Sequence, residues 1–311
     1  MLFDTVIIGG GPAGLTAGLY TSRARLKTLL IERGLPGGQV MTTELVENYP
    51  GFEEGIMGPE LSAKMEKQAR KFGLEIVQDS VREISLDGKT KKIILEEGRQ
   101  YEAKSVILCT GAHPRLLGVK GEGELRGKGV SYCATCDGAF FKGQKIAVVG
   151  GGNSAVEEAL FLTKFAKEVH VIHRRDQLRA DRIVQERAFA NEKIKFIWDS
   201  VVEEIRGDEE VTSLLIKNRK TQQESVLDVQ GIFIYVGYIP NTEFLSGFIT
   251  LDEEGYIVTD HNMATSVPGV FAAGDVRANS VKQISVAVGS GTTAAISAAK
   301  YIEENFQERL K

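Results

Sequence analysis

Two glycine-rich turns mark this chain as two copies of one folding plan. The first reads GGGPAG from Gly9 to Gly14, and the second reads GGGNSA from Gly150 to Ala155. Each follows an apolar strand-like run, and a second apolar run ends 23 residues after the first glycine of each turn, at Glu32 and at His173. The two copies are therefore offset by 141 residues at both ends. A strand, a glycine turn, a helix and a second strand form the start of a doubly wound dinucleotide-binding unit.

The repeat continues beyond this start. Helices are predicted over about 12–24 and 154–165, and residues 75–81 (EIVQDSV) resemble residues 195–201 (KFIWDSV). Turn signals follow in both copies, and each copy closes with a buried strand, at 106–111 and at 232–237. We therefore predict an α/β fold with two doubly wound units of three-layer type, each carrying a small antiparallel insert.

The tail from Gly255 onward has no glycine turn of its own. It holds a strand at 270–273, then Gly274-Asp275, then a helix of small residues from about Ser285. We expect this tail to return to the first unit, so that the second unit is an insertion into the first. Prolines at 114 and 240 suit the two crossings. The predicted domains are 1–113 with 242–311, and 114–241.

Composition and charge narrow the class of protein. The chain has 311 residues, of which 42% are hydrophobic and 26% charged, as in soluble globular proteins of two domains. A net charge of −4 favours neither nucleic acid nor a membrane surface, and no apolar run approaches the ~20 residues that span a bilayer. No sorting pattern is present near Met1. The expectation is a cytoplasmic protein.

The end of the second strand distinguishes the two nucleotide sites. In both units the glycine turn lets backbone and helix N-terminus approach a pyrophosphate; the alternative is two ordinary glycine-rich loops. Glu32 can accept hydrogen bonds from ribose hydroxyls and would repel a 2′-phosphate, which favours FAD in the first unit. His173, Arg174 and Arg175, with Arg179 nearby, favour the 2′-phosphate of NADPH in the second. The alternative for the arginines is a solvated helix face.

A CxxC pair, Cys133 and Cys136, lies just before the second glycine turn. A structural zinc site usually needs about four ligands, whereas Cys109 stands alone in a buried strand and the four histidines lack ligand spacing. Three cysteines are too few for a disulfide scaffold, and in a reducing compartment CxxC is more often redox-active or metal-binding. We therefore interpret the pair as a redox dithiol and Cys109 as a small buried residue.

Residues after the dithiol have two interpretations each. Asp137 lies within reach of either sulfur and serves either as an acid or as a cap or turn residue. Phe140 and Phe141 form either an apolar patch for a protein partner or part of the core.

The order of these parts resembles the low-molecular-weight, bacterial-type thioredoxin reductases of the pyridine nucleotide-disulfide oxidoreductase family. The resemblance rests on Cys133-Ala134-Thr135-Cys136-Asp137-Gly138, the two glycine turns and the His173-Arg174-Arg175-Asp176 stretch, and it covers essentially the whole chain. It implies a homodimer that uses FAD and NADPH to reduce thioredoxin. It also implies that Cys136 faces the flavin, that Cys133 attacks the partner disulfide and that Asp137 is the acid/base.

The combined prediction assigns a set of residues to each cofactor. Those expected to contact FAD are Gly9, Gly11, Pro12, Ala13, Gly14, Glu32, Arg33, Gly38, Gln39, Asn48, Val81, Gly111, Gly274, Asp275, Lys282, Gln283 and Ile284. Those expected to contact NADPH are Gly150, Gly152, Asn153, Ser154, Ala155, His173, Arg174, Arg175 and Arg179. The chain departs from the family pattern at Lys282, Tyr132 and Lys128, which stand where Arg, a small residue and Arg are usual.

Other acceptors stay open at this point. The same chemistry would serve another thiol-disulfide carrier, such as a peroxidase or a glutaredoxin-like protein. A ferredoxin- or quinone-reducing flavoprotein would not need the two cysteines. Because the dithiol and the NADPH turn share one unit and need the same flavin, the resemblance also implies rotation of the inserted domain about its two crossings.

Overall fold

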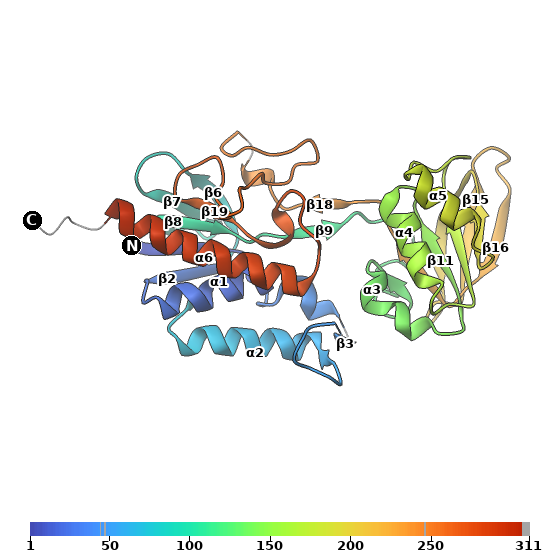
Figure 1. The fold of residues 1–311 in the computed structure, drawn as a ribbon, viewed down its shortest axis with the longest axis horizontal. Helices are drawn as coiled ribbons and strands as arrows, with labels where there is room; N and C mark the ends of the chain where they lie inside the picture. Colours follow the sequence, from blue (N-terminus) through green and yellow to red (C-terminus); the bar gives the residue numbers. More distant parts are fainter. Residues whose placement is uncertain (44, 47, 246, 307–311) are drawn as a thin grey trace, which may run out of the picture. The chain divides into compact units, whose positions relative to one another are not determined.

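The computed structural model describes residues 1–43, 45–46, 48–245 and 247–306, and it divides into two compact units. One unit comprises Met1–His113 and Ile239–Lys311, of which 307–311 lie outside the described residues, and the other comprises Pro114–Tyr238. The sequence places the boundaries at 113/114 and 241/242. Along the chain, the second unit is thus one continuous segment, and the segments before and after it form the first unit (Figure 1).

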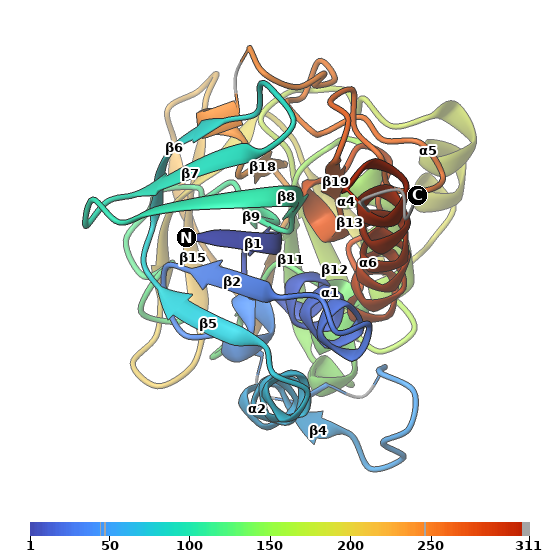
Figure 2. The same cartoon turned by 90° about the vertical axis from the view of Figure 1, so that its left-hand side faces the viewer.

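A seven-stranded sheet forms the centre of the first unit. Its strands are β1 (Leu2–Ile8), β2 (Thr28–Glu32), β5 (Glu75–Gln78), β6 (Val81–Ser85), β7 (Lys91–Leu95), β8 (Gln100–Leu108) and β19 (Val270–Ala272). The order β5-β2-β1-β8-β7-β6 is visible in Figure 2. The first residues of β8 pair with antiparallel β7, whereas its last three pair with parallel β19. The tail therefore adds a strand to the first unit, as the sequence indicated.

The alternation of side chains along β1 separates the two faces of this sheet. Ile7 packs into a cluster with Leu15 of helix α1 (Pro12–Arg23) and with alanines of helix α6 (Ile284–Phe306). Val6 and Ile8 face the opposite cluster, which contains residues of β6 and β7. Helix α2 (Gly58–Lys71) lies beside α1. Shorter elements complete the unit: η1 (Gly38–Thr42), β3 (Leu45–Val46), β4 (Ile56–Met57), η3 (Glu243–Leu245) and η4 (Gly274–Val276).

The second unit contains a five-stranded parallel sheet in the order β10-β17-β11-β12-β13. These strands are β10 (Val130–Ser131), β11 (Lys145–Val149), β12 (Glu168–Ile172), β13 (Ile194–Ile197) and β17 (Gly231–Ile234). Helices α4 (Asn153–Leu162) and α5 (Arg182–Phe189) pack on one face. The other face is covered by a separate antiparallel sheet of β14 (Ser200–Arg206), β15 (Ser213–Asn218) and β16 (Glu224–Asp228). Between β10 and β11 lie α3 (Ala134–Asp137) and η2 (Gly138–Phe141).

The parallel strands of the two units follow the same spatial order. The series β5-β2-β1-β8-β19 in the first unit corresponds to β13-β12-β11-β17-β10 in the second. The fifth strand comes from the tail of the chain in one unit and from the segment before the glycine turn in the other. The prediction of two doubly wound, three-layer units with antiparallel inserts is confirmed. No helix among the described ranges has the length and apolar content that a membrane crossing requires.

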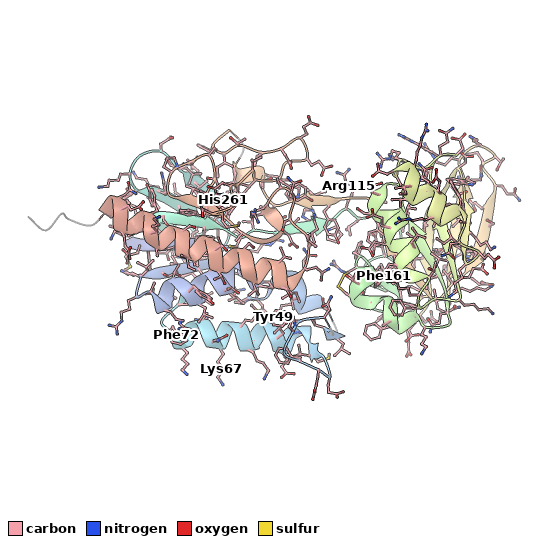
Figure 3. The ribbon with its side chains drawn as sticks, in the orientation of Figure 1. Tyr49, Lys67, Phe72, Arg115, Phe161 and His261 are labelled. Carbon is pink, nitrogen blue, oxygen red and sulfur yellow. A yellow bond between two sulfur atoms is a disulfide. The ribbon has the colours of Figure 1, made fainter. Side chains whose placement is uncertain are left out.

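The two crossings between the units run side by side. Strands β9 (Ala112–Pro114) and β18 (Tyr238–Pro240) form a two-stranded sheet. Just beyond β9, the N–H of Arg115 donates to the carbonyl of Gly237 at 2.9 Å; Arg115 is labelled in Figure 3. The inserted segment therefore begins and ends at neighbouring points.

Candidate nucleotide sites and redox dithiol

The first glycine turn joins β1 to α1 with no room for side chains at two positions. Gly9 has φ +104°, and a β-carbon there would overlap the carbonyl of Cys109. A β-carbon on Gly14 would overlap the carbonyl of Gly9. Gly11 has a different role, because it is the N-cap residue of α1. No side chain caps this end of the helix, and the first turn contains no acidic residue. The helix N–H groups therefore stay available, and the turn fits a pyrophosphate.

Glu32 lies at the end of β2 with its carboxylate fixed by backbone N–H groups. One oxygen accepts from Gly10 N at 2.6 Å and the other from Gly34 N at 3.0 Å. Each carboxylate oxygen can accept a further hydrogen bond. The arrangement fits a ribose with free hydroxyls and disfavours a 2′-phosphate.

Other residues expected to contact FAD come from separate parts of the first unit. Gly38 and Gly111 adopt φ of +60° and +67°. The amide of Gln39 donates to the carbonyl of Ala112, and the amide of Asn48 donates to Oε1 of Gln283 at 3.2 Å. Arg33 is exposed, Val81 is the first residue of β6, and Ile284 is the first of α6.

Asp275 provides a half-buried carboxyl group. It lies in η4, directly after Gly274, where the tail strand β19 leads toward α6. Burial raises its pKa to about 6, and the nearby Lys282 ammonium opposes this shift. Lys282 also lies over the ring of Tyr256, with Nζ 4.8 Å from the centroid. A half-buried carboxylate that can accept hydrogen bonds from hydroxyl groups fits the polyol chain of a flavin nucleotide.

The second glycine turn repeats the geometry of the first. A β-carbon on Gly150, at φ +150°, would lie 2.5 Å from Cβ of Ala155. Gly152 is the uncapped N-cap of α4, and a β-carbon there would meet no protein atom within 4 Å. Asn153, at the start of α4, is held by Asp181, whose N–H donates to Asn153 Oδ1 at 2.7 Å. Backbone can therefore approach a second pyrophosphate here.

His173 occupies the position that Glu32 has in the first unit. Its side chain is buried, with only 5% exposed, and its ring packs against Gly151. Its Nε2 is buried without a hydrogen-bond partner among the described residues. Burial is the main cause that lowers the pKa of His173, and three neighbouring arginines add to it. A neutral imidazole therefore lies beneath a cationic surface.

The cationic surface includes one residue that the sequence pattern missed. Arg174, Arg175 and Arg179 are exposed after β12. Arg219, in the turn between β15 and β16, donates through Nη1 to the carbonyl of Arg174 at 3.4 Å. The next residue, Lys220, is ion-paired with acidic groups instead. Strand pairing between distant segments brings Arg219 here, so the linear motif gave no signal for it.

The dithiol lies on a single turn of helix. Cys133 and Cys136 are joined in a disulfide, with Cα atoms 5.3 Å apart, and Cys133 is the N-cap of α3. Ser131 Oγ donates to a carboxylate oxygen of Asp137 at 2.6 Å, and the N–H of Cys133 donates to Ser131 Oγ at 3.1 Å. Asp137 makes no side-chain cap to η2. Cys109 is buried and free, and burial raises the pKa of its thiol.

Phe140 and Phe141 have opposite environments. Phe140 is 49% exposed, whereas Phe141 is 9% exposed and packs edge-on against Phe233 with centroids 5.2 Å apart. The core interpretation therefore holds for Phe141, whereas Phe140 lies at the surface, and its contact with a partner stays a prediction.

The chain matches known proteins over nearly its full length. Residues 3–291 match the family described as pyridine nucleotide-disulphide oxidoreductase. A thioredoxin reductase of Listeria innocua is 55% identical over 97% of this chain and 95% of its own, and one of Bacillus subtilis is 51% identical over 100% and 98%. The crystal structure of thioredoxin reductase from Streptococcus pyogenes is 51% identical, covers 97% of this chain and 99% of its own, and has a TM-score of 0.92.

These similarities agree with the geometry of the two glycine turns and the disulfide. They cover both units, including the insert that carries Cys133 and Cys136. The chain belongs to the pyridine nucleotide-disulphide oxidoreductase family and, within it, to the thioredoxin reductases of the low-molecular-weight bacterial type.

Proposed function

We propose that this chain is an NADPH-dependent flavoprotein that reduces the disulfide of thioredoxin through FAD and the Cys133–Cys136 disulfide. The observation that carries the proposal is the Cys133–Cys136 disulfide, which lies on a half-buried helical turn of the same unit as the second glycine turn and its arginines. The curated relatives with this architecture are thioredoxin reductases.

The first unit holds FAD. The uncapped end of α1 at Gly11 receives the pyrophosphate, Glu32 accepts from ribose hydroxyls, and Asp275 accepts from the polyol chain. The other residues assigned to FAD in the sequence analysis would supply further contacts. The second unit holds NADPH, with the pyrophosphate at Gly152 and the 2′-phosphate among Arg174, Arg175 and Arg219. When bound, NADPH and FAD would supply the electron pair that reduces the Cys133–Cys136 disulfide to the dithiol.

The dithiol carries out thiol–disulfide exchange. The Cys133 thiolate attacks one sulfur of the thioredoxin disulfide, which forms a mixed disulfide and releases one thioredoxin thiolate. The Cys136 thiolate then attacks Cys133 Sγ, which restores the Cys133–Cys136 bond and releases the second thiolate. Two electrons leave the enzyme, and two protons end on thioredoxin. Asp137, already hydrogen-bonded to Ser131, exchanges the proton of the flavin-side thiol.

Partner contact, assembly and location complete the proposal. The exposed Phe140 gives thioredoxin an apolar contact four residues beyond Cys136. The protein acts as a homodimer in the cytoplasm and engages neither nucleic acid nor membrane. The support is the likeness to thioredoxin reductases and, for location, a redox CxxC pair suited to a reducing compartment. Light scattering on the purified protein tests the dimer.

Rotation of the inserted unit follows from its contents. The dithiol and the NADPH turn share this unit, yet each must meet the flavin of the other unit, and the dithiol must also meet a protein. We infer that β9 and β18 act as hinges. An engineered cross-link that locks the two units should abolish turnover, and full turnover in the locked protein would contradict rotation.

One assay tests the function. The purified protein should be yellow, and added NADPH should drive reduction of thioredoxin disulfide while NADH does so far more slowly. Glutaredoxin-like and peroxidase carriers serve as competing substrates. A Cys133→Ser variant should retain its flavin and lose thioredoxin reduction. A colourless protein that cannot be reconstituted with flavin would overturn the proposal.

A further inference from the structure

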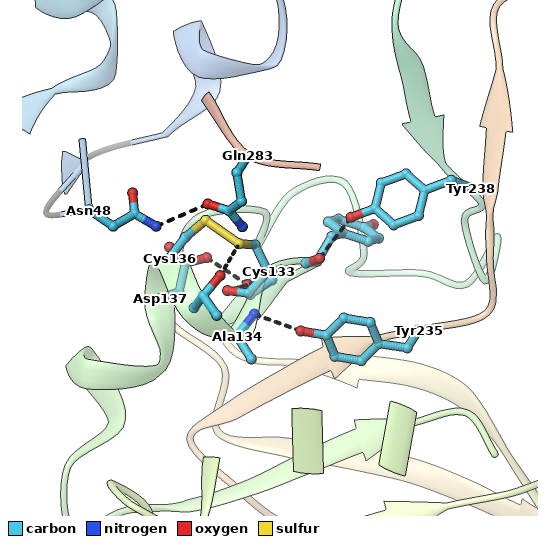
Figure 4. Close-up of a disulfide and its surroundings, with 11 residues drawn as sticks. Asn48, Cys133, Ala134, Cys136, Asp137, Tyr235, Tyr238 and Gln283 are labelled. Carbon is cyan, nitrogen blue, oxygen red and sulfur yellow. Dashed lines mark hydrogen bonds between the residues drawn. A yellow bond between two sulfur atoms is a disulfide. The ribbon is translucent and has the colours of Figure 1, made fainter. Parts of the chain in front are cut away.

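Two backbone polar groups that flank Cys133 are each bonded to a tyrosine hydroxyl. The carbonyl of Tyr132, on one side of Cys133, accepts from the hydroxyl of Tyr238 at 3.0 Å. The N–H of Ala134, on the other side, donates to the hydroxyl of Tyr235 at 2.6 Å. Figure 4 shows both tyrosines directed at this segment. The two peptide groups that flank Cys133 are therefore each held by a tyrosine hydroxyl.

Both tyrosines belong to one stretch of chain, residues 235–238. This stretch continues β17, which pairs in parallel with β10, the strand that leads to Cys133. The ladder ends at Ser131 and Phe233. Beyond that point the backbone groups near Cys133 have no neighbouring strand to pair with, and the two side chains supply the missing hydrogen bonds.

The hydroxyls act in complementary ways. The hydroxyl of Tyr238 donates a hydrogen bond to a carbonyl, whereas the hydroxyl of Tyr235 accepts one from an N–H. Burial of the Tyr235 hydroxyl, together with the Glu158 carboxylate, raises the pKa of Tyr235 well above its ordinary value. Tyr235 therefore stays a neutral phenol at working pH.

We propose that Tyr235 and Tyr238 are positioning residues for the redox dithiol. By fixing the peptide groups on either side of Cys133, they hold its sulfur where it meets Cys136, so they support closure of the disulfide. This inference rests on the proposed function for its catalytic consequence only. Neither tyrosine contacts a sulfur atom through these bonds, and both act through the backbone.

Thiol–disulfide exchange with glutathione measures how strongly the two tyrosines favour the Cys133–Cys136 disulfide, and it needs no flavin turnover. In a buffered mixture, two glutathione thiols reduce the Cys133–Cys136 disulfide to two thiols and form one glutathione disulfide, so the equilibrium ratio reports how well the ring is held closed. Each of Tyr235→Phe and Tyr238→Phe should shift this equilibrium about fivefold toward the dithiol, the usual net contribution of one hydrogen bond. The double variant should shift it further in the same direction than either single variant does.

Tyr132→Phe is the matched control. It removes a buried hydroxyl from the residue next to Cys133, but that hydroxyl donates to Glu122 at 2.8 Å rather than to a peptide group beside the dithiol. It should lower thermal stability and leave the glutathione equilibrium within about twofold. An equal shift in this control, or no shift in both test variants, would overturn the proposal.

Turnover separates this proposal from the proposed function. In the test variants, kcat for thioredoxin should fall several-fold with KM unchanged, because resolution by Cys136 is slowed. NADPH-driven reduction of ferricyanide, which takes electrons without the dithiol, should not change. If the parent protein reduced no thioredoxin, the proposed function would fail, yet the glutathione equilibrium would still decide the role of the tyrosines. If Tyr235→Phe did not fold, Tyr238→Phe alone would decide.

Discussion

The imidazole of His173 lies against Gly151 so closely that a β-carbon on this glycine would overlap the ring. The equivalent pair in the first unit, Gly10 and Glu32, is nearly as close: a β-carbon on Gly10 would lie 3.1 Å from Cβ of Glu32. In both units, therefore, the middle glycine of the turn packs on the residue at the end of the second strand, which is the last residue of β2 in one unit and the residue directly after β12 in the other. That residue decides which nucleotide is accepted, so the glycine fixes the position of the selecting side chain.

Substitution of Gly151 tests this relationship through a double-mutant cycle. Gly151→Ala should lower the free energy of unfolding by about 1–3 kcal/mol, because the buried ring must move. In a His173→Ala background the same change should cost almost nothing, because the space is then free. Urea unfolding of the parent protein, the two single variants and the double variant gives the coupling free energy between the two positions. Equal costs in both backgrounds would show that the ring is not what Gly151 accommodates.

Gly152 should affect binding without affecting folding. A β-carbon there meets no protein atom within 4 Å, so Gly152→Ala should leave the melting temperature unchanged. The methyl group would stand where the backbone approaches the pyrophosphate, and NADPH should bind at least about tenfold more weakly. Titration calorimetry measures this. Gly123→Ala is the control, since its β-carbon also meets nothing nearby and it lies outside the turn.

Arg219 should contribute to the choice between NADPH and NADH. Arg219→Ala should raise the Kd for NADPH about tenfold, as expected for a charge-assisted contact to phosphate, and leave the Kd for NADH unchanged. The difference should shrink as salt concentration rises. Arg187→Ala is the control, because Arg187 is exposed on α5 of the same unit. A parallel loss of NADH affinity would place the effect of Arg219 on folding rather than on the 2′-phosphate.

Asp275 should make the stability of the flavin-free protein depend on pH. Its pKa is raised from 3.8 to about 6, so between these values the folded form binds more protons than the unfolded form. Stability therefore falls as pH rises through this window, by at most about 3 kcal/mol, and the loss is complete above about pH 6. Asp275→Asn should stabilise the apoprotein at pH 8 more than at pH 5 while weakening FAD binding. Urea unfolding at both pH values, with flavin titration, checks this; equal gains at the two pH values would contradict it.

Phe140 and Phe141 should separate partner binding from stability. Phe140→Ala should raise the KM for thioredoxin several-fold and leave the unfolding free energy within about 0.5 kcal/mol, because the ring is half exposed. Phe141→Ala should cost about 3–5 kcal/mol, since it removes a ring packed on Phe233. Ferricyanide reduction serves as the partner-free reference. An unchanged KM in Phe140→Ala would remove this residue from the thioredoxin contact.

The sequence predicted the fold well because its signals are local and repeated. Strand, turn, helix and strand follow one another within about 25 residues of each first glycine, so β1, α1 and β2 were recognisable, as were β11, α4 and β12. The return of the tail as β19 was also predicted, from the absence of a third glycine turn. Helix ends were less certain: α4 ends at Leu162, three residues before the expected end.

What the sequence could not reveal depends on pairing between distant segments. Arg219 reaches Arg174 only because β15 and β16 form a hairpin over the sheet. Tyr235 and Tyr238 reach the dithiol only because β17 lies beside β10, about a hundred residues away along the chain. Phe140 is exposed and Phe141 is buried because of the direction of one short 3-10 helix, and their adjacency in the sequence does not determine that direction.

The side-by-side course of β9 and β18 gives the inserted unit a property of its own. Its entry and exit points are neighbours, so the host needs only a brief bridge to close the gap if the insert is removed. Such an arrangement lets one module be gained, lost or exchanged without unravelling the other. The same arrangement that joins two nucleotide-binding units in one polypeptide therefore also allows them to be separated.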